Sequence, residues 1–314
     1  MKFKKPKFWD LEKPNWISHL LLPLTLPLQL NNFFLKKKIK KTIHNIQTIC
    51  IGNIYIGGTG KTPTTVKLNE ILKELQIKTS IGKKYYSSHE DEIMILKKKN
   101  DLICLSSRKE ILKSAIEKGY SSIIFDDGLQ DKNVFYDLQF VCFDADNWIG
   151  NGNLLPSGPL RENVSSLKKY DGVFLKYNDL TENIIEDKIK KINPKIKIFK
   201  TYYEIKNINQ FDLSRNYLIF SGIGNPTSFK KTLINNKFKI INEMVFPDHF
   251  DYKKSDIDKI KKKAKEINAQ IVTTEKDFLK ISKIDNSKIK FLEIDLVIQN
   301  KENLVNFLKS KIYE

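Results

Sequence analysis

The sequence predicts an α/β protein in which parallel strands are covered by helices on both faces. Short apolar runs rich in β-branched residues alternate along the chain with stretches that suit helices, which is the order of β/α units. The chain has 314 residues, which is long for one compact domain and comfortable for two. With 40% hydrophobic and 29% charged residues, it has the composition of a folded globular protein.

The predicted elements fall into two sets. The first set has strands at 46–51, 78–81, 102–105, 122–125, 138–143 and 172–176, and helices at 63–75 and 109–118. The second set has strands at 196–203, 217–220, 238–245, 271–273 and 291–297, and helices at 226–235 and 255–268. A last amphipathic helix is expected at about 302–312. The sequence thus divides into an N-terminal segment 1–41 that belongs to the first domain, a domain 42–176, a polar linker 177–195, a second domain 196–297 and a C-terminal helix 298–314.

Residues 50–63 have the order of a phosphate-binding loop. An apolar strand leads into a glycine cluster, then Lys61 and Thr62, and then a helix for which Pro63 suits the first turn. In such loops the lysine reaches the β- and γ-phosphates and the hydroxyl binds Mg²⁺. The pattern departs from the usual form at Tyr55, where glycine is expected, and a simple glycine-rich turn before a helix is the alternative. The residues expected around the nucleotide are Tyr55, Ile56, Gly57, Gly58, Thr59, Gly60, Lys61 and Thr62.

Two further segments carry acidic or basic groups that suit a phosphoryl-transfer site. Asp126 and Asp127 follow a buried strand, where a phosphate-loop fold places its second Mg²⁺ partner. In the glycine- and proline-rich loop 150–162, Arg161 could clamp a phosphate and Glu162 could add a carboxylate beside the metal. The alternatives are a polar turn after the strand and a turn-rich loop with one ion pair.

Histidine is rare, with four in the chain, and one of them stands out by its neighbours. His249 follows Asp248 in the second half of the chain, and Asp91 lies in an acidic stretch of the first half. Taken alone, each is more often a surface residue than a catalyst.

The charge and the N-terminal segment point to an anionic membrane surface more than to nucleic acid. The formal net charge is +18, but lysines occur in every segment and no nucleic-acid fold motif is present. Residues 16–30 are apolar, yet they contain two prolines and are short of the ~20 residues that span a bilayer. No small-residue cleavage site follows, which argues against a signal peptide. An interfacial membrane anchor and a helix packed on the core are equally good interpretations of this segment. The basic residues that follow it are Lys36, Lys37, Lys38, Lys40 and Lys41.

Together these segments resemble the tetraacyldisaccharide 4′-kinases, the lipid A 4′-kinases of Gram-negative bacteria. The matching motifs run in family order over nearly the whole chain, at residues 6–9, 21–24, 52–63, 91–92, 126–130, 150–162, 222–226, 248–249 and 274–277. The sequence departs from the family pattern at four positions: Tyr55 replaces serine or threonine, Lys83 an arginine, Glu90 a small residue and Asp131 a histidine.

The resemblance implies an α/β/α sandwich of the P-loop type with a second, smaller α/β domain and the site in the cleft between them. It implies a kinase that uses ATP and Mg²⁺ to phosphorylate the 4′-hydroxyl of a lipid A disaccharide 1-phosphate. Lys61 would hold phosphates, and Asp91 would act as the base, paired across the cleft with His249. The metal would be held by Thr62, Asp126, Asp127 and Glu162, and the substrate by Arg161, Arg108 and Gln130.

The same resemblance places the protein at the cytoplasmic face of the inner membrane as a peripheral enzyme, with the lipid precursor and the anionic surface as partners. No sequence feature indicates nucleic acid or an obligate protein partner. Two other classes stay open from the motifs alone. One is a membrane-associated positioning ATPase, against which Ile56 counts because that class has a signature lysine there. The other is a soluble small-molecule kinase or ligase on the same core.

Overall fold

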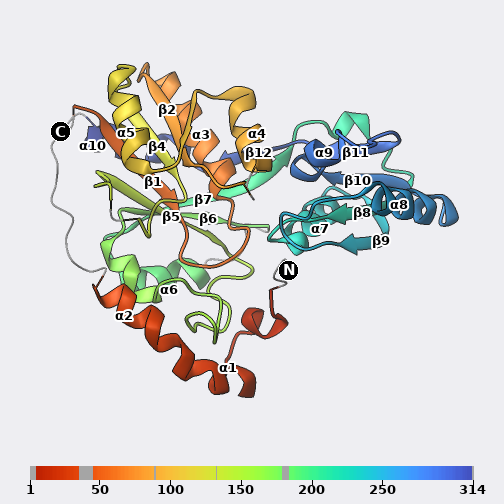
Figure 1. Cartoon of the computed structure of the whole chain (residues 1–314), viewed down its shortest axis with the longest axis horizontal. Helices are drawn as coiled ribbons and strands as arrows, with labels where there is room; N and C mark the ends of the chain where they lie inside the picture. Colours follow the sequence, from red (N-terminus) through yellow and green to blue (C-terminus); the bar gives the residue numbers. More distant parts are fainter. Residues whose placement is uncertain (1–4, 35–44, 88–89, 132, 179–183, 313–314) are drawn as a thin grey trace. The chain divides into compact units, whose positions relative to one another are not determined.

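The computed structural model describes the chain except residues 1–4, 35–44, 88–89, 132, 179–183 and 313–314, so the predicted basic cluster at 36–41 lies outside the described residues (Figure 1). The chain forms two compact units. The large unit contains Lys5–Tyr85, Lys99–Tyr202 and the chain from Ile298 onward. The small unit contains Tyr86–Lys98 and Tyr203–Val297. Strands β7 and β12 carry the chain from one unit to the other.

The large unit is built on an eight-stranded sheet with the order β12-β7-β6-β5-β1-β4-β2-β3. Each strand from β7 to β3 in this order runs parallel to its neighbours. Its strands are β1 (Gln47–Gly52), β2 (Thr79–Lys84), β3 (Leu102–Leu105), β4 (Ser122–Asp126), β5 (Leu138–Asp144), β6 (Gly172–Lys176), β7 (Lys197–Ile205) and β12 (Ile294–Ile298). Its helices are η1 (Lys7–Asp10), α1 (Trp16–Leu21), η2 (Leu22–Thr25), α2 (Leu26–Phe34), α3 (Lys61–Glu74), α5 (Arg108–Glu117), η4 (Val164–Lys169), α6 (Ile184–Ile192) and α10 (Lys301–Ile312).

Alternate residues of these strands pack on opposite faces of the sheet, as the strand period requires. On one face, Phe125 and Phe143 belong to a buried cluster with Ile111 of α5 and Ile189 of α6. On the other face, the ring of Phe140 lies among three more aromatic rings, those of Phe174, Phe199 and, from α10, Phe307. The predicted parallel sheet covered on both faces is therefore confirmed.

The small unit repeats the design on a four-stranded parallel sheet with the order β11-β10-β8-β9. Its elements are α4 (Glu90–Lys99), η5 (Ile208–Gln210), β8 (Asn216–Ser221), α7 (Pro226–Asn235), β9 (Lys239–Val245), α8 (Lys254–Glu266), β10 (Gln270–Thr274), α9 (Glu275–Ile281) and β11 (Ile289–Leu292). Tyr217 and Ile219 of β8 pack toward α7, whereas Leu218 and Phe220 pack toward α8 and α9.

The structure divides the chain differently from the sequence in three places. The stretch 177–195, expected to be a linker, contains α6, whose Ile189 is fully buried in the large unit, and that unit continues to Tyr202. Helix α4 and its flanking residues, expected inside the first domain, belong to the small unit. The single strand expected at 291–297 is two strands, β11 and β12. Helix α3 also begins two residues before the predicted start, at Lys61.

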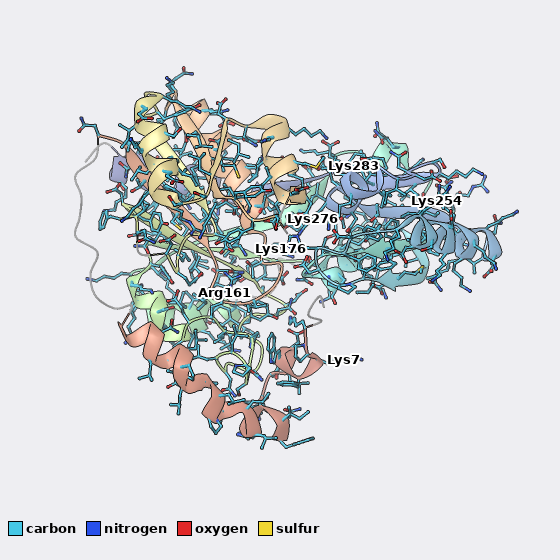
Figure 2. The ribbon with its side chains drawn as sticks, in the orientation of Figure 1. Lys7, Arg161, Lys176, Lys254, Lys276 and Lys283 are labelled. Carbon is cyan, nitrogen blue, oxygen red and sulfur yellow. The ribbon has the colours of Figure 1, made fainter. Side chains whose placement is uncertain are left out.

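Within the described part of the chain, no helix is long and apolar enough to cross a membrane. Basic side chains are spread over both units, as the exposed Lys7, Lys254 and Lys283 illustrate (Figure 2).

Candidate active site

The glycine-rich loop joins β1 to α3 and is held by its own side chains. Asn53 donates from Nδ2 to Thr59 Oγ1 at 3.1 Å and to the Gly57 carbonyl at 3.4 Å. Gly60 precedes the helix with φ 83°, a left-handed conformation that glycine adopts without strain. Lys61 then begins α3, so the N–H groups of the first turn, which have no partner inside a helix, lie where an anion is bound in phosphate loops.

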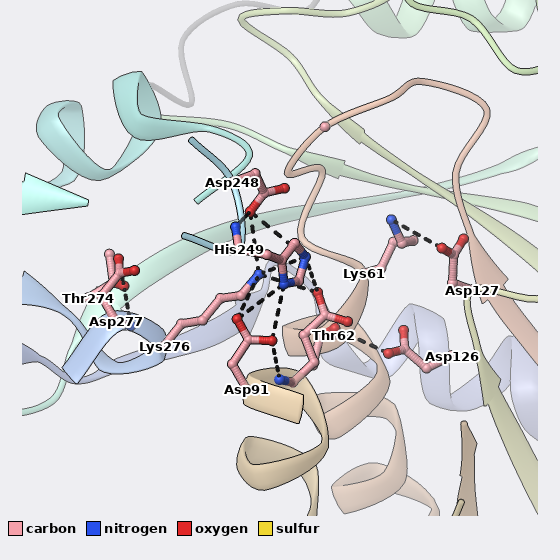
Figure 3. A network of polar contacts seen from close by, with 12 residues as sticks. Lys61, Thr62, Asp91, Asp126, Asp127, Asp248, His249, Thr274, Lys276 and Asp277 are labelled. Atoms are coloured by element: carbon pink, nitrogen blue, oxygen red, sulfur yellow. Dashed lines mark hydrogen bonds and ion pairs between the residues drawn. The ribbon is translucent and has the colours of Figure 1, made fainter. Parts of the chain in front are cut away.

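Asp127 lies among basic groups at the end of β4. Its carboxylate is 3.8 Å from Lys61 Nζ (Figure 3). Arg161 Nη1 lies 3.1 Å from the same carboxylate. Its φ of 59° is left-handed, which is uncommon for a residue with a side chain and frequent at functional sites. Burial would raise the pKa of the Asp127 carboxyl, but the charges of Lys61 and Arg161 outweigh it and hold the pKa below its ordinary value. Asp127 is therefore ionised at neutral pH.

Asp126 links the start of α3 to a buried lysine. Its Oδ2 accepts a hydrogen bond from Thr62 Oγ1 at 3.2 Å and forms an ion pair with Lys83 Nζ at 2.6 Å. The side chains of Asp126 and Lys83 are 0% and 4% exposed, so the pair is buried. Lys83, which stands where the family pattern has arginine, thus keeps a cation beside the strand-end carboxylate.

The remaining predicted residues of this unit support one another. Gln130 Nε2 donates to Glu162 Oε1 at 2.9 Å, and Glu162 also binds Lys169 Nζ at 2.6 Å. Arg108 is buried, with Nη1 2.6 Å from Asp131 Oδ2 and Nη2 donating to the Asp127 carbonyl. Among the described residues, no group of three or more His, Cys, Asp or Glu side chains is arranged to hold a metal ion.

Tyr55 does not face the nucleotide loop with its side chain. The ring is 2% exposed, and its hydroxyl donates to Asp10 at 2.5 Å. The ring packs with Leu154 and Leu160, and burial together with the Asp10 carboxylate raises the pKa of the phenol far above its ordinary value. Tyr55 was predicted to bind the nucleotide, but its side chain is buried away from the loop, so only its backbone can contribute.

Most of the 150–162 loop holds the N-terminal segment. Asn151 Nδ2 donates to Ser18 Oγ at 2.9 Å, and Ser157 Oγ donates to the Ser18 carbonyl at 2.7 Å. Gly150 has φ 55°, and a Cβ there would lie 2.1 Å from the Trp9 carbonyl oxygen, so only glycine fits. The loop that ends in Arg161 and Glu162 is thereby tied to helix α1.

The helices of the N-terminal segment have an inverted distribution of side chains. Polar Ser18 and Thr25 are 0% and 1% exposed, whereas Trp16, Leu20 and Leu24 are 73%, 69% and 60% exposed. Leu26 and Leu30 extend the same exposed apolar surface along α2. A soluble domain seldom leaves such a patch open to water.

Asp91 and His249 are brought together in the small unit. Asp91 lies in the first turn of α4, and its Oδ1 is 3.1 Å from Nδ1 of His249, which follows β9 (Figure 3). We expected this pair to form across a cleft between two domains. Both residues instead belong to the same compact unit. His249 has a left-handed φ of 55°, like Asp127.

Two lysines of α9, Lys276 and Lys280, complete this cluster. Lys280 Nζ is 2.9 Å from Asp91 Oδ2, and Lys276 Nζ is 3.7 Å from the same oxygen. Burial would raise the pKa of the Asp91 carboxyl, but the hydrogen bonds from His249 and Lys280 and the charge of Lys276 hold it far below its ordinary value. Sequence reasoning missed both lysines as site residues, as it did Asn53. Lys276 lies inside the motif at 274–277, and only the family resemblance could have drawn attention to it.

The chain is similar to known proteins over its whole length. A sequence profile of the family described as tetraacyldisaccharide-1-P 4′-kinase matches residues 17–90 and 83–313. The tetraacyldisaccharide 4′-kinase of Pelagibacter ubique is 47% identical over 308 residues, which cover 98% of each chain. That of Rickettsia akari is 33% identical over 334 aligned positions, with 100% of this chain and 99% of the relative covered.

The fold has a counterpart among solved structures. The crystal structure of LpxK from Aquifex aeolicus in complex with ATP aligns with a TM-score of 0.67 at 22% sequence identity. The alignment covers 95% of this chain and all of the other.

Proposed function

The chain belongs to the tetraacyldisaccharide 4′-kinase family, and we propose that it transfers the γ-phosphoryl group of ATP to the 4′-hydroxyl of a lipid A disaccharide 1-phosphate. The contact between Asp91 and His249 carries this proposal. Phosphate loops occur in many nucleotide hydrolases and switches, whereas a buried carboxylate held by an imidazole adds a group that can accept a proton from an alcohol.

The nucleotide is proposed to bind to the loop before α3. Lys61 and the backbone N–H groups of residues 57–62 would hold its phosphates, as the loop geometry supports. Arg161, 3.1 Å from Asp127, would balance the charge of that carboxylate when Lys61 binds phosphate.

Mg²⁺ fits the oxygen-donor set at the start of α3. The Thr62 hydroxyl and the Asp126 carboxylate lie 3.2 Å apart, and Mg²⁺ in kinases is held by one or two such oxygens together with phosphate and water. When bound, the ion would neutralise charge on the β- and γ-phosphates. Asp127 is proposed to supply a second carboxylate oxygen near the ion. Glu162 is engaged by Gln130 and Lys169, so we propose that it adds negative charge near the metal without binding the ion directly.

Asp91 is proposed to receive the proton of the acceptor hydroxyl. The bond from O4′ to the γ-phosphorus forms as the bond from that phosphorus to the leaving oxygen of ADP breaks, and the hydroxyl proton passes to Asp91 and then to solvent. A carboxylate with a lowered pKa is a weak base, but it suffices because the transition state of phosphoryl transfer is loose and the proton is lost late. His249 would keep the carboxylate oriented.

Arg161 is the substrate residue best placed to reach a phosphate, since its side chain is 30% exposed. Arg108 and Gln130, also predicted to hold substrate, are committed to Asp131 and Glu162. We propose that these two residues keep the loop after β4 in shape and act on phosphate only through it.

The exposed apolar surface of α1, η2 and α2 supports a peripheral position on a membrane, which we propose is the cytoplasmic face of the inner membrane. Ser18 and Thr25 are buried against the protein while most of the leucines of these helices are exposed, which favours interfacial anchoring over core packing. The acyl chains of the lipid substrate could then stay in the bilayer. The same surface counts against the soluble small-molecule kinase.

The proposal is tested by transfer of label from [γ-³²P]ATP to a tetraacyl disaccharide 1-phosphate in mixed micelles. We expect labelled lipid that depends on both substrates and is absent for Lys61→Ala. ATP hydrolysis at the same rate with and without lipid, and no labelled lipid, would instead support the positioning ATPase.

A further inference from the structure

The two lysines of the Asp91 cluster are carried by a firmly anchored helix. Asp277 of α9 is 0% exposed, and its carboxylate accepts hydrogen bonds from the Gly222 N–H at 2.9 Å and from the Tyr252 hydroxyl at 3.1 Å. Lys276 and Lys280, four residues apart, lie on one side of this helix. The backbone from which both lysines project is thereby fixed relative to the sheet of the small unit.

Lys280 ties together both parts of the catalytic pair. Its Nζ is 2.9 Å from Asp91 Oδ2 and 3.3 Å from the carbonyl oxygen of Phe250, the residue after His249. One cation thus fixes the carboxylate and the loop that presents the imidazole.

Lys276 acts on the other side of the imidazole. Its Nζ lies 3.3 Å from His249 Nε2, while Nδ1 of the same ring lies 3.1 Å from Asp91 Oδ1. An ammonium group can only donate hydrogen bonds, so Nε2 must carry the lone pair and Nδ1 the proton. That tautomer donates from Nδ1 to the Asp91 carboxylate.

Two further carboxylates face His249 on the Nε2 side of the ring. Glu92 Oε1 and Asp248 Oδ1 are 3.7 and 3.9 Å from Nε2, and Lys276 Nζ is 3.5 Å from each of these oxygens. Lys276 therefore offsets the negative charge on the Nε2 side of the ring.

We propose that Lys276 and Lys280 are positioning residues for phosphoryl transfer: Lys276 selects the neutral His249 tautomer that donates to Asp91, and Lys280 fixes the carboxylate that receives the substrate proton. This proposal rests on the kinase function proposed above. Neither lysine needs to contact ATP or the sugar for this role.

The first test reads the ring nitrogens directly, without activity. The full chain is labelled with ¹⁵N-histidine, His249 is assigned by its absence in His249→Gln, and ¹⁵N shifts are followed against pH. In the wild type we expect an unprotonated Nε2 and a protonated Nδ1 near neutral pH. In Lys276→Met, Nε2 has lost the donor at 3.3 Å, so the ring should no longer hold this tautomer as its single form.

Lys98→Met is the matched control. Lys98 also links α4 to α9, through a 2.9 Å ion pair with Glu275, but it is 51% exposed and contacts neither Asp91 nor His249. This variant should leave the ring spectrum and kcat unchanged. Lys276→Arg keeps the charge and should retain the wild-type tautomer, which separates positioning from loss of fold.

The second test is kinetic. Lys276→Met and Lys280→Met should lower kcat by about tenfold or more with little change in KM for ATP, because a misplaced catalytic group costs rate more than binding. The acid limb of the kcat profile should move to higher pH in both variants, because both lysines lower the pKa of the Asp91 carboxyl. A wild-type ring spectrum and pH profile in Lys276→Met would overturn the proposal, as would equal effects in Lys98→Met. If the spectra change as expected but the wild type transfers no phosphate to lipid, the kinase function fails and the tautomer assignment stands.

Discussion

A double-mutant cycle on Asp91 and His249 gives the sharpest prediction about the chemistry. The two side chains are 3.1 Å apart, and that of Asp91 is 2% and that of His249 18% exposed. Removing either one therefore breaks the same hydrogen-bonded pair. Near-isosteric changes, Asp91→Asn and His249→Gln, remove the base and the donor with little change in volume. Each should lower kcat by ~10³-fold, the middle of the range for general-base catalysis, or about 4 kcal/mol of barrier.

The double variant separates a joint role from two independent roles. If the residues act as a unit, it should also lose ~10³-fold, whereas independent roles would multiply to ~10⁶-fold. The coupling energy expected is thus about 4 kcal/mol. Single-turnover transfer, with enzyme in excess over lipid and ATP saturating, measures the rate constant of the chemical step apart from product release. In steady state, KM for ATP should change little. A multiplicative loss would refute the pair and leave His249 with a separate role, most simply in binding substrate.

The same Asp91→Asn variant tests the electrostatics of the cluster. Folding lowers the pKa of the Asp91 carboxyl below its ordinary value of 3.8, so the stability that it contributes is complete above that value and is lost as pH falls below it. Urea unfolding from about pH 7 to about pH 3 should therefore show the wild type losing free energy of unfolding more steeply at the acid end than Asp91→Asn. Parallel curves would mean that the carboxyl titrates normally in the fold.

Lys61→Ala should abolish transfer and leave the thermal midpoint within a few degrees of wild type, because its ion pair with Asp127 is long at 3.8 Å and contributes little; near-normal turnover would remove the phosphate loop from the mechanism. Asp126→Ala and Asp127→Ala should both lower kcat, and the one nearer the metal should also raise the Mg²⁺ concentration for half-maximal rate; an unchanged rate and Mg²⁺ dependence in both would make this strand end a simple turn. Leu24→Gln should weaken binding to anionic vesicles by about tenfold or more, since burying a leucine is worth ~1.5–3 kcal/mol, whereas Ile234→Gln, at a 51% exposed position of the small unit, should not. Equal binding by both variants would return the N-terminal helices to a purely structural role.

The sequence was most informative where a strand feeds directly into a glycine turn. The phosphate loop, the strand-end pair Asp126 and Asp127 and the β/α alternation all depend on local patterns, and the structure has the elements in the predicted order. Helix α6 was missed because its surroundings are rich in Asn and Lys, although Ile185, Ile189 and Ile192 repeat at helical spacing. The polar composition of the stretch was given more weight than the helical spacing of its isoleucines.

Residues that act through long-range contacts could not be predicted from the sequence. Asp91 and Lys276 are far apart in the chain, and nothing local indicates that α4 and α9 pack in one unit. Tyr55 was assigned to the nucleotide by its place in the motif, but its hydroxyl bonds to Asp10, 45 positions upstream. Such pairings follow from topology, and a single sequence does not report them.

The most direct measurement of the central claim is the position of the new phosphate. Lipid product made by the wild type from ATP is purified and a ¹H–³¹P correlation spectrum is recorded. The account predicts a new phosphorus coupled to the sugar proton at C4′, with the original phosphorus still coupled to the proton at C1. A new phosphorus coupled to any other sugar proton, or joined to the 1-phosphate as a diphosphate, would contradict it.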